Sequence, residues 1–560
     1  MRLFASLVTF SATAAEAPGS ALMRRLLLLA SLVVFVVGPA APGSARPNVV
    51  TGATFLITGH GWGHGVGMAQ YGAYGYAQHG FTYDQIVAHY FPGTQLGRAP
   101  VSRVRVLLSS GAKKLKITSA AGFTVRDASG QTHDVAAGSY TLTPALSLRV
   151  MGAAKAAPLT GPITFAPGPS PLSLGRRYRG SIQLDVVAGR LRAINVVNLE
   201  QYLSGVVPAE MPSAWSPEAL KAQAVVARSY ALAVRKTTGP FDLYPDTRSQ
   251  VYRGYSGEKP SSNDAVDATQ GEVLTYDGKV AVTYFYSTSG GRTAAINDVW
   301  NSQPVPYLVS VSDPYDAISP YHDWGPFPFT SAKLGKLLKV PGKLVDVETA
   351  LNASGRVSTL TAHGTQGDVT VKGTDVRRIL GLRSTWFRVG VLALDPLSAK
   401  AVPYGSIATL TGLGRGLGEL KLEQRPVGGS VWASAATTKA KPDGTVSVAV
   451  KATAPAQYRL SSSGIASGVA TLVVAPTIRL KVPTAPTALG GVVQPAIENA
   501  PVQIQRSTAT GWTTVVKART DAQGSFSASL AVVPGTYRAR VAPGKGWAVA
   551  LSPELQVVKT

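Results

Sequence analysis

One acidic residue, Glu210, stands out because nearly all of its neighbours in sequence are apolar. The four residues before it (206–209) and the two after it (211–212) carry apolar side chains. A carboxyl group in apolar surroundings resists ionisation, so we expect its pKa to be raised. A raised pKa lets a carboxylic acid keep its proton near neutral pH, as general acid catalysis requires. The sequence therefore singles out Glu210 as a candidate catalytic acid.

A long helix is expected directly after this acid. Ser216 is a typical N-cap, Pro217 suits the first helical position, and neither Gly nor Pro interrupts the chain from there to Arg235. Apolar residues cover nearly every face, which predicts a buried helix. Two polar stripes interrupt this surface, one of Lys221, Arg228 and Arg235 and the other of Gln223 and Tyr230. They are either solvated edges or the lining of a cleft beside Glu210, and the sequence leaves both possibilities open.

Three pieces of sequence follow one another here: YLSGVVPAEMP at 202–212, Trp215, and PEALKAQAVVARSYAL at 217–232. Together they resemble the SpoIID/LytB family of bacterial cell-wall proteins, and weaker similarity extends over about 46–97 and 100–393. The resemblance implies lytic cleavage of peptidoglycan glycan strands, with Glu210 as the catalytic acid.

A single carboxylate is enough for such a reaction. Ordinary glycosidases use two carboxylates, and this block offers only one convincing candidate. In a lytic transglycosylase the 6-hydroxyl of N-acetylmuramic acid attacks its own anomeric carbon, so no activated water is needed and a 1,6-anhydro sugar forms. We expect the nearby Glu200 to form a salt bridge or to begin a helix.

Further residues are candidate substrate-binding groups. The polar loop after the helix carries Asp246, Gln250 and Tyr252, whose types suit sugar hydroxyls, although a plain surface loop is nearly as good an interpretation. A predicted buried strand, Val280–Tyr286, leads into STSGG, whose amides suit an anion or an acetamido group at Ser289 and Gly290. The complete candidate set is Lys221, Gln223, Arg228, Tyr230, Asp246, Gln250, Tyr252, Ser289, Gly290, His64 and Gln70.

The glycine-rich segment ITGHGWGHGVGMAQYG also resembles the family. In the family this segment usually comes at the end of the catalytic domain, whereas in this chain it comes before that domain. We therefore expect it to pack against the C-terminal edge of the domain. A glycine at every second position from Gly59 to Gly67 argues against a helix. His60 and His64 lack a nearby cysteine or acidic ligand, so we expect no metal and no cofactor. These histidines and Gln70 are expected to shape a sugar-binding wall or to bond within the fold.

Charge and the N-terminal residues bear on location. The 560 residues carry a formal net charge of +24 and no cysteine. Nucleic acid would suit this charge, but no basic cluster with interleaved aromatics is present, so we predict anionic cell-wall polymers as partners and no nucleic acid. Met23-Arg24-Arg25, the apolar run 26–37 and small residues up to Ala45 predict a signal peptide cleaved near Ala45, with Met23 as a possible start. An uncleaved anchor is a minor alternative; otherwise the protein is secreted to the cell wall.

The predicted architecture is an α+β catalytic domain, with mixed or antiparallel strands and a buried helix, followed by two all-β immunoglobulin-like repeats. Trp432 and Trp512 lie 80 positions apart, and Tyr458 and Tyr537 lie 79 apart, which indicates a tandem repeat. The predicted divisions are 1–45 (signal peptide), 46–97 (Gly/His-rich segment), 98–190 (β-rich subdomain), 191–395 (SpoIID/LytB core), 403–480 and 481–560 (repeats).

Three functions fit this sequence. The first is the lytic transglycosylase, for which peptidoglycan glycan strands are the substrate. The second is a non-catalytic enhancer that binds a cell-wall amidase, in which Glu210 has a structural or recognition role. The third, metal-dependent hydrolysis through His60 and His64, requires a metal site that the residue pattern does not favour.

Overall fold

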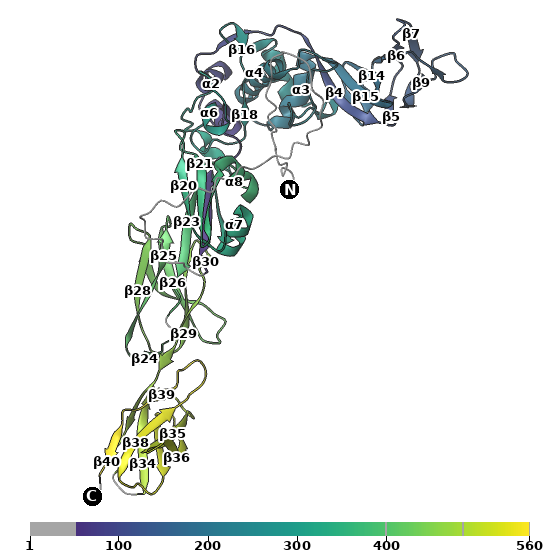
Figure 1. The fold of residues 1–560 in the computed structure, drawn as a ribbon. Coiled ribbons are helices and arrows are strands. Elements are labelled where there is room, and N and C mark those ends of the chain that lie inside the picture. Colours follow the sequence, from purple (N-terminus) through teal and green to yellow (C-terminus); the bar gives the residue numbers. More distant parts are fainter. Residues whose placement is uncertain (1–51, 398–399, 484–486, 559–560) are drawn as a thin grey trace, which may run out of the picture.

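The computed structural model describes residues 52–397, 400–483 and 487–558, so the predicted signal peptide (1–45) lies outside the described residues. The described chain is mostly β, with eight α-helices. A helical region lies between a β-rich arm and two further β units that follow one another toward the C-terminus (Figure 1). Within the described ranges, no helix is long and apolar enough to cross a membrane.

The helical region is built around α4 (Pro217–Val234), which begins after Ser216 and is buried over most of residues 219–232, as predicted. Helices α1, α2, α3 and α5 all pack against it. Helix α3 ends at Glu210 because Met211 takes an extended backbone and Pro212 follows. The bounds of these helices are α1 (Gln70–Gln78), α2 (Tyr83–Tyr90), α3 (Leu199–Glu210) and α5 (Pro260–Ala268). Strands β16 (Glu272–Tyr276) and β3 (Gln95–Arg98) pair beside them.

The β-rich arm consists of short strands with alternating burial, as predicted from the sequence between residues 101 and 197. Its last strand, β15, leads directly into α3. The larger sheet has the order β4 (Arg103–Ala112), β15 (Arg190–Asn198), β14 (Ser181–Val187), β11 (Ile163–Ala166), β6 (Phe123–Arg126) and β7 (Thr132–Val135). The smaller sheets comprise β13 (Arg176–Tyr178), β12 (Leu172–Leu174), β5 (Leu115–Ser119) and β8 (Gly138–Leu142), with β9 (Ser147–Leu148) and β10 (Ala157–Pro158) as a separate pair.

The glycine-rich segment begins with β1 (Thr54–His60), which lies between two strands from much later in the chain. It pairs in antiparallel fashion with β19 (Asp323–Thr330) and β23 (Phe387–Leu394). The chain therefore brings its first described strand back against the end of the family-like region. Elements packed nearby are α7 (Ser331–Leu338), β20 (Leu344–Leu351), β21 (Val357–Gly364), β22 (Gly367–Lys372) and α8 (Gly373–Leu380).

The prediction of one continuous strand over Val280–Tyr286 is wrong. Only β17 (Lys279–Val280) and β18 (Phe285–Tyr286) are strand, because the residues between them bond elsewhere. The Tyr284 carbonyl accepts from the Met68 N–H at 3.0 Å, and β18 pairs in parallel with β2 (Met68–Ala69). This stretch therefore fixes the glycine-rich segment in place. Short helical segments nearby are the α-helix α6 (Ile296–Val299) and the 3-10 helices η1 (Tyr255–Gly257) and η2 (Asp316–Ile318).

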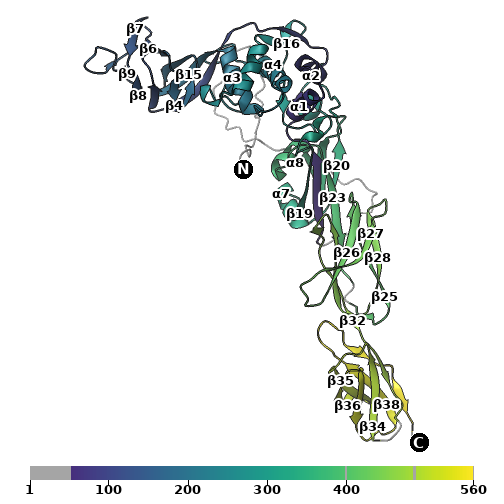
Figure 2. The ribbon, with the colours of Figure 1, turned by 180° about the vertical axis from the view of Figure 1, so that it is seen from behind.

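The two C-terminal units share one strand arrangement. In the first, β26 (Glu419–Pro426) lies between β27 (Ala433–Lys439) and β29 (Ala456–Ser462); in the second, β35 (Pro501–Thr508) lies between β36 (Gly511–Arg519) and β38 (Gly535–Val541). Figure 2 labels the second set near the C-terminus. The sheet of β1 and β23 continues into β25 (Ile407–Arg415) and β28 (Thr445–Lys451), so it crosses the predicted boundary between 395 and 403.

The remaining strands complete these two units. They are β24 (Val402–Pro403), β30 (Ile465–Ala466), β31 (Ala470–Leu472) and β32 (Val474–Ala475) in the first, and β33 (Thr477–Leu480), β34 (Ala488–Gln494), β37 (Ser525–Ser529), β39 (Ala550–Leu551) and β40 (Leu555–Val557) in the second.

Candidate active site

Glu210 is the last residue of α3 and is half-buried. Its Oε1 atom accepts a hydrogen bond from the Val251 N–H at 3.1 Å. Burial raises the pKa of the Glu210 carboxyl to about 7, against the smaller opposing effects of this hydrogen bond and of the Arg253 charge. The direction is the one predicted from the apolar neighbours. At neutral pH this group is therefore able both to donate and to accept a proton.

The glycine-rich segment contributes directly to the surroundings of Glu210 through Gln70. The Gln70 amide nitrogen donates to the Glu210 carbonyl at 3.2 Å and lies 3.3 Å from the Gln223 side-chain oxygen. Three helices, α1, α3 and α4, therefore meet at one hydrogen-bonded cluster. Two of the predicted binding residues, Gln70 and Gln223, are brought to Glu210 in this way.

The two polar stripes of α4 have different surroundings. Tyr230 belongs to the same stripe as Gln223. Burial raises the pKa of the Tyr230 hydroxyl, and so do the neighbouring Tyr284 and the charge of Glu210, so Tyr230 lies close to Glu210. In the other stripe, Lys221 donates to Glu218 at 2.7 Å. The structure therefore places the Gln223 stripe near the candidate acid, whereas the Lys221 side chain is engaged with a neighbouring residue of its own helix.

Arg228 does not fit the predicted substrate-binding role, because its side chain is completely buried. Its guanidinium binds the Glu200 carboxylate, with a closest distance of 2.5 Å, and donates to the Glu272 and Val266 carbonyls at 3.0 and 3.3 Å. Glu200 was expected to form a salt bridge or to begin a helix, and it does both, since it pairs with Arg228 and lies in the first turn of α3. This pair joins α3, α4, α5 and β16.

The loop after α4 contacts Glu210 through its backbone. Gln250 is buried, accepting from the Tyr202 hydroxyl at 3.1 Å and donating to the Ala227 carbonyl at 3.2 Å. Tyr252 is also buried and donates to the Asn195 side chain at 2.8 Å. These two residues flank Val251 and hold its N–H against the carboxyl. Their side chains bond within the protein.

Asp246, at the start of the same loop, lies on the surface, where its carboxylate pairs with Arg248 at 2.7 Å. Both side chains of this pair are about half exposed, at 47% for Asp246 and 59% for Arg248. This placement matches the plain surface loop that the sequence left open as the alternative.

The anion that the STSGG turn binds is a carboxylate of the protein itself, that of Asp316. The backbone N–H groups of Ser289 and Gly290 donate to the buried Asp316 carboxylate at 2.9 and 2.8 Å, and His322 lies 3.1 Å from the same group. These two amides are therefore engaged within the fold. The turn also sits tightly against Gly61, where a side-chain carbon would come within 2.6 Å of the Ser289 carbonyl.

His64 lies in the glycine-rich segment with both ring nitrogens engaged. Its Nε2 atom lies 3.1 Å from the Phe285 carbonyl, and its Nδ1 accepts from the Val66 N–H at 3.1 Å. Burial and the charges of Arg377 and Arg356 lower the pKa of His64 to about 3. The ring is therefore neutral and supports the turn. Across the described residues, no three His, Cys, Asp or Glu side chains are grouped so as to hold a metal ion.

Three aromatic residues that were not selected from the sequence pack against one another, close in the chain to Gln70 and Glu210. The Trp215 ring stacks on Tyr74 at 4.5 Å and meets Tyr71 edge-on at 4.7 Å. All three are half-buried, and Tyr71 directly follows Gln70. Partly exposed aromatic faces of this kind suit the faces of sugar rings. Trp215 is part of the motif that resembles the family, so the sequence could have indicated it as a site residue. For Tyr71 the sequence offered only its position next to Gln70.

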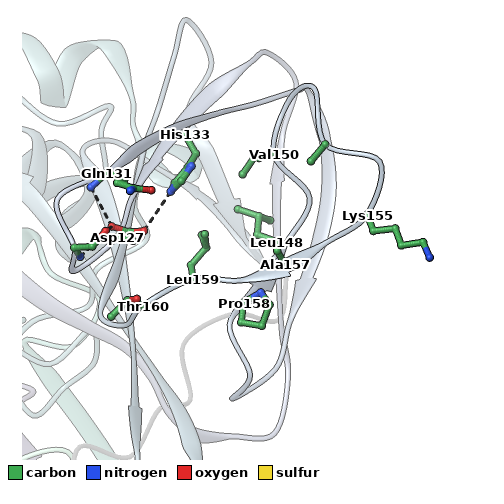
Figure 3. Close-up of a pocket in the computed structure, with 12 residues that line it drawn as sticks. Asp127, Gln131, His133, Leu148, Val150, Lys155, Ala157, Pro158, Leu159 and Thr160 are labelled. Carbon is green, nitrogen blue, oxygen red and sulfur yellow. Dashed lines mark hydrogen bonds and ion pairs between the residues drawn. The ribbon is translucent and has the colours of Figure 1, made fainter.

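A cavity of about 380 Å³ lies elsewhere, in the β-rich arm (Figure 3). Asp127 and His133 meet at its wall, 3.2 Å apart, and Asp127 also accepts from the backbone N–H groups of Ser129 and Gln131. These bonds hold a turn together. None of the residues that surround Glu210 lines this cavity.

Comparison with known proteins places these residues in context. A family model described as SpoIID, Stage II sporulation protein, matches residues 187–276, which include Glu210, Arg228 and Val251. An "Amidase enhancer" of Bacillus subtilis (strain 168) is 47% identical over 115 residues, covering 20% of this chain and 15% of that protein. "Stage II sporulation protein D" of the same strain is 33% identical over 216 residues, covering 35% of this chain and 61% of that protein.

The match therefore spans less than two thirds of the length of each of these relatives. Among solved structures, a tetra-tandem repeat from the extending region of a large adhesion protein covers 82% of this chain at 12% identity, with a TM-score of 0.20. That score is too low to carry an argument about the fold.

Proposed function

Because this chain belongs to the SpoIID/LytB family, we propose that it cleaves peptidoglycan glycan strands as a lytic transglycosylase, with Glu210 as its single acid and base. The observation that carries this proposal is the state of Glu210. Burial raises the pKa of its carboxyl to about 7, and this effect outweighs the opposing Val251 hydrogen bond and Arg253 charge. A carboxylic acid with such a pKa suits proton transfer in both directions at neutral pH.

The proposed reaction needs no second carboxylate. Glu210 donates its proton to the glycosidic oxygen while the bond from that oxygen to the anomeric carbon of N-acetylmuramic acid breaks. The 6-hydroxyl oxygen of the same sugar then bonds to the anomeric carbon and gives its proton to the Glu210 carboxylate. Glu210 is regenerated, and the products are a free 4-hydroxyl and a 1,6-anhydro end. The nucleophile is part of the substrate, so its effective concentration is high.

The residues around Glu210 have supporting roles in this proposal. The Val251 N–H holds one carboxyl oxygen, which leaves the other to meet the substrate. Gln70 fixes the end of α3 through the Glu210 carbonyl. Tyr71 and Trp215 offer ring faces for neighbouring sugars. The proposed setting is outside the cytoplasm, where glycan strands and anionic wall polymers are the expected partners.

The test is incubation of the full chain with intact and peptide-stripped glycan, followed by mass spectrometry of the products. Glu210→Gln keeps the shape and an acceptor for the Val251 N–H, but it carries no proton to transfer. We expect release of anhydro ends to fall by at least about a hundredfold while glycan binding is kept. Asp246→Asn, which changes a surface carboxylate, is the matched control. Normal anhydro release by Glu210→Gln would remove this residue from the mechanism.

A second function is favoured by the relative named "Amidase enhancer", which is 47% identical over its match. In this alternative the chain binds a cell-wall amidase and cleaves no glycan, and Glu210 takes part in recognition. Glycan masses would then stay unchanged on incubation with the chain alone. The rate of a wall amidase would instead rise when the chain is added.

A further inference from the structure

The outer face of the second C-terminal unit gathers positive charge. Strands β36, β35 and β38 lie side by side, with alternate side chains directed to the core and away from it. In the cross-strand register, Lys517 lies opposite Gln503, which lies opposite Arg540. The outward residues that carry the inference are Trp512, Lys517, Arg519, Arg538 and Arg540. The three strands contain no Asp or Glu.

The two arginines at the centre of this face are held by neutral groups. The Arg538 guanidinium lies 4.1 Å from the centre of the Trp512 ring, and its Nε donates to the Gln505 side chain at 2.8 Å. Arg540 donates to Gln503 at 3.5 Å. Side-chain amides orient a guanidinium without neutralising it, so both positive charges stay available to an anion.

The first unit has the same arrangement, but a carboxylate stands beside its matching arginine, and a second arginine, Arg425, is held by the neutral Gln457. Arg459 lies 4.2 Å from the Trp432 ring centre, but its Nε donates to the Glu423 carboxylate at 2.6 Å. Glu423 faces Arg459 in the register as Gln505 faces Arg538. A second acid, Glu419, lies opposite Lys439. Since the arginine and tryptophan stack forms with either partner, the stack itself does not require the neutral glutamine of the second unit.

We propose that the outer face of the second unit binds a linear wall polymer whose units are joined by phosphodiesters. Guanidinium groups pair with phosphate in a planar, bidentate geometry, and a lysine ammonium adds a point charge. Along β38 and along β36 the cations stand two residues apart, about 7 Å at the usual rise of a strand, which suits repeated anions. The proposal rests on the proposed cell-wall function for the presence of such a polymer, but not on the chemistry of Glu210.

A nucleic acid is a poorer fit for this face. Proteins that hold single-stranded nucleic acid combine cations with aromatic side chains whose faces are free to stack on bases. Here the Arg538 guanidinium covers one face of Trp512. A polymer without aromatic bases can bind through the lysine and arginine charges alone and does not need a free face of Trp512.

The test is co-sedimentation of the full chain with purified cell-wall sacculi, before and after hydrogen fluoride treatment that cleaves phosphodiesters. Replacing Lys517 and Arg540 with Gln is expected to weaken binding to untreated sacculi about tenfold at about 0.1 M salt. Lys421→Gln with Lys439→Gln removes the same charge from the first unit and is expected to weaken binding by less than about twofold. Hydrogen fluoride treatment should abolish the difference between the pairs.

Each other result overturns the proposal. Equal losses from the two pairs would mean that net charge alone is responsible. If binding to treated sacculi is undiminished and still depends on Lys517, the ligand is the glycan. If binding to single-stranded DNA is equally tight and depends on Lys517, the ligand is a nucleic acid. Arg538→Lys keeps the charge but not the planar stack, and it should weaken binding about threefold with an unchanged melting temperature. Anhydro release from soluble glycan should be unaffected by all of these variants, so failure here is distinct from failure of the Glu210 mechanism.

Discussion

The two ends of α3 carry two glutamates with opposite surroundings. Glu200, in the first turn, accepts from the buried Arg228 guanidinium and from the Gly271 N–H at 3.1 Å. Glu210, in the last turn, accepts one backbone N–H and has its pKa raised to about 7. The helix dipole favours a negative charge at the first position and disfavours it at the second. The partner of each carboxyl therefore decides whether it is structural or chemically active.

Removing the partner of Glu200 is expected to have the largest effect on stability. Arg228→Met leaves a largely buried carboxylate without a cation, so we expect the free energy of unfolding to fall by about 3–5 kcal/mol. Urea denaturation followed by circular dichroism measures this. The double variant with Glu200→Gln should recover part of the loss, and a loss below about 1 kcal/mol in the single variant would show that the pair is not structural.

At the other end of the helix, removing the ionisable group should stabilise the protein in alkaline solution. The pKa of Glu210 is about 7 when folded against an ordinary value of 4.5, so the wild-type protein loses stability as pH rises between these values. Glu210→Gln does not ionise. It should therefore match the wild type near pH 4 and exceed it by up to about 3 kcal/mol near pH 8. Urea midpoints at the two pH values measure this, and equal stability at both would contradict the raised pKa.

A smaller effect is expected from the aromatic residue beside the active end. Trp215→Ala removes a half-buried ring face, so kcat/KM for peptide-stripped glycan should fall about tenfold, mainly through KM. Trp432→Ala, in the first C-terminal unit, is the control and should leave the cleavage of soluble glycan unchanged. Equal effects of the two substitutions would argue against a sugar site at Trp215.

The smallest effect is expected at Asp246, an exposed carboxylate whose partner is the neighbouring Arg248. Its pair with Arg248 is exposed, so Asp246→Asn should change the free energy of unfolding by less than about 0.5 kcal/mol. Cleavage should stay within about twofold of wild type, as measured by anhydro release. A larger loss would restore Asp246 as a substrate-binding residue.

Local features of this molecule were predictable from the sequence. The N-cap at Ser216 and the unbroken apolar stretch after it specified α4, and the apolar neighbours of Glu210 gave the direction of its pKa shift. Both depend on residues close together in the chain. The alternating strands of the β-rich arm were visible for the same reason.

Contacts between distant segments were not predictable. Glu210 is held by the N–H of Val251, a group that every residue except proline possesses, so no side-chain pattern marks it. Asp316 lies 26 positions after Gly290, and nothing local shows that its carboxylate occupies the amides of the STSGG turn. Val280–Tyr286 has the composition of a strand, but its pairing with the glycine-rich segment is decided by tertiary structure.

The most direct test of Glu210 as a catalytic acid is a titration of its carboxyl by carbon-13 NMR in the full chain, assigned by the loss of one signal in Glu210→Gln. We expect one glutamate side-chain signal with a midpoint near pH 7. A midpoint near the ordinary value of 4.5 would mean that Glu210 is a carboxylate at neutral pH, unable to act as the proposed acid.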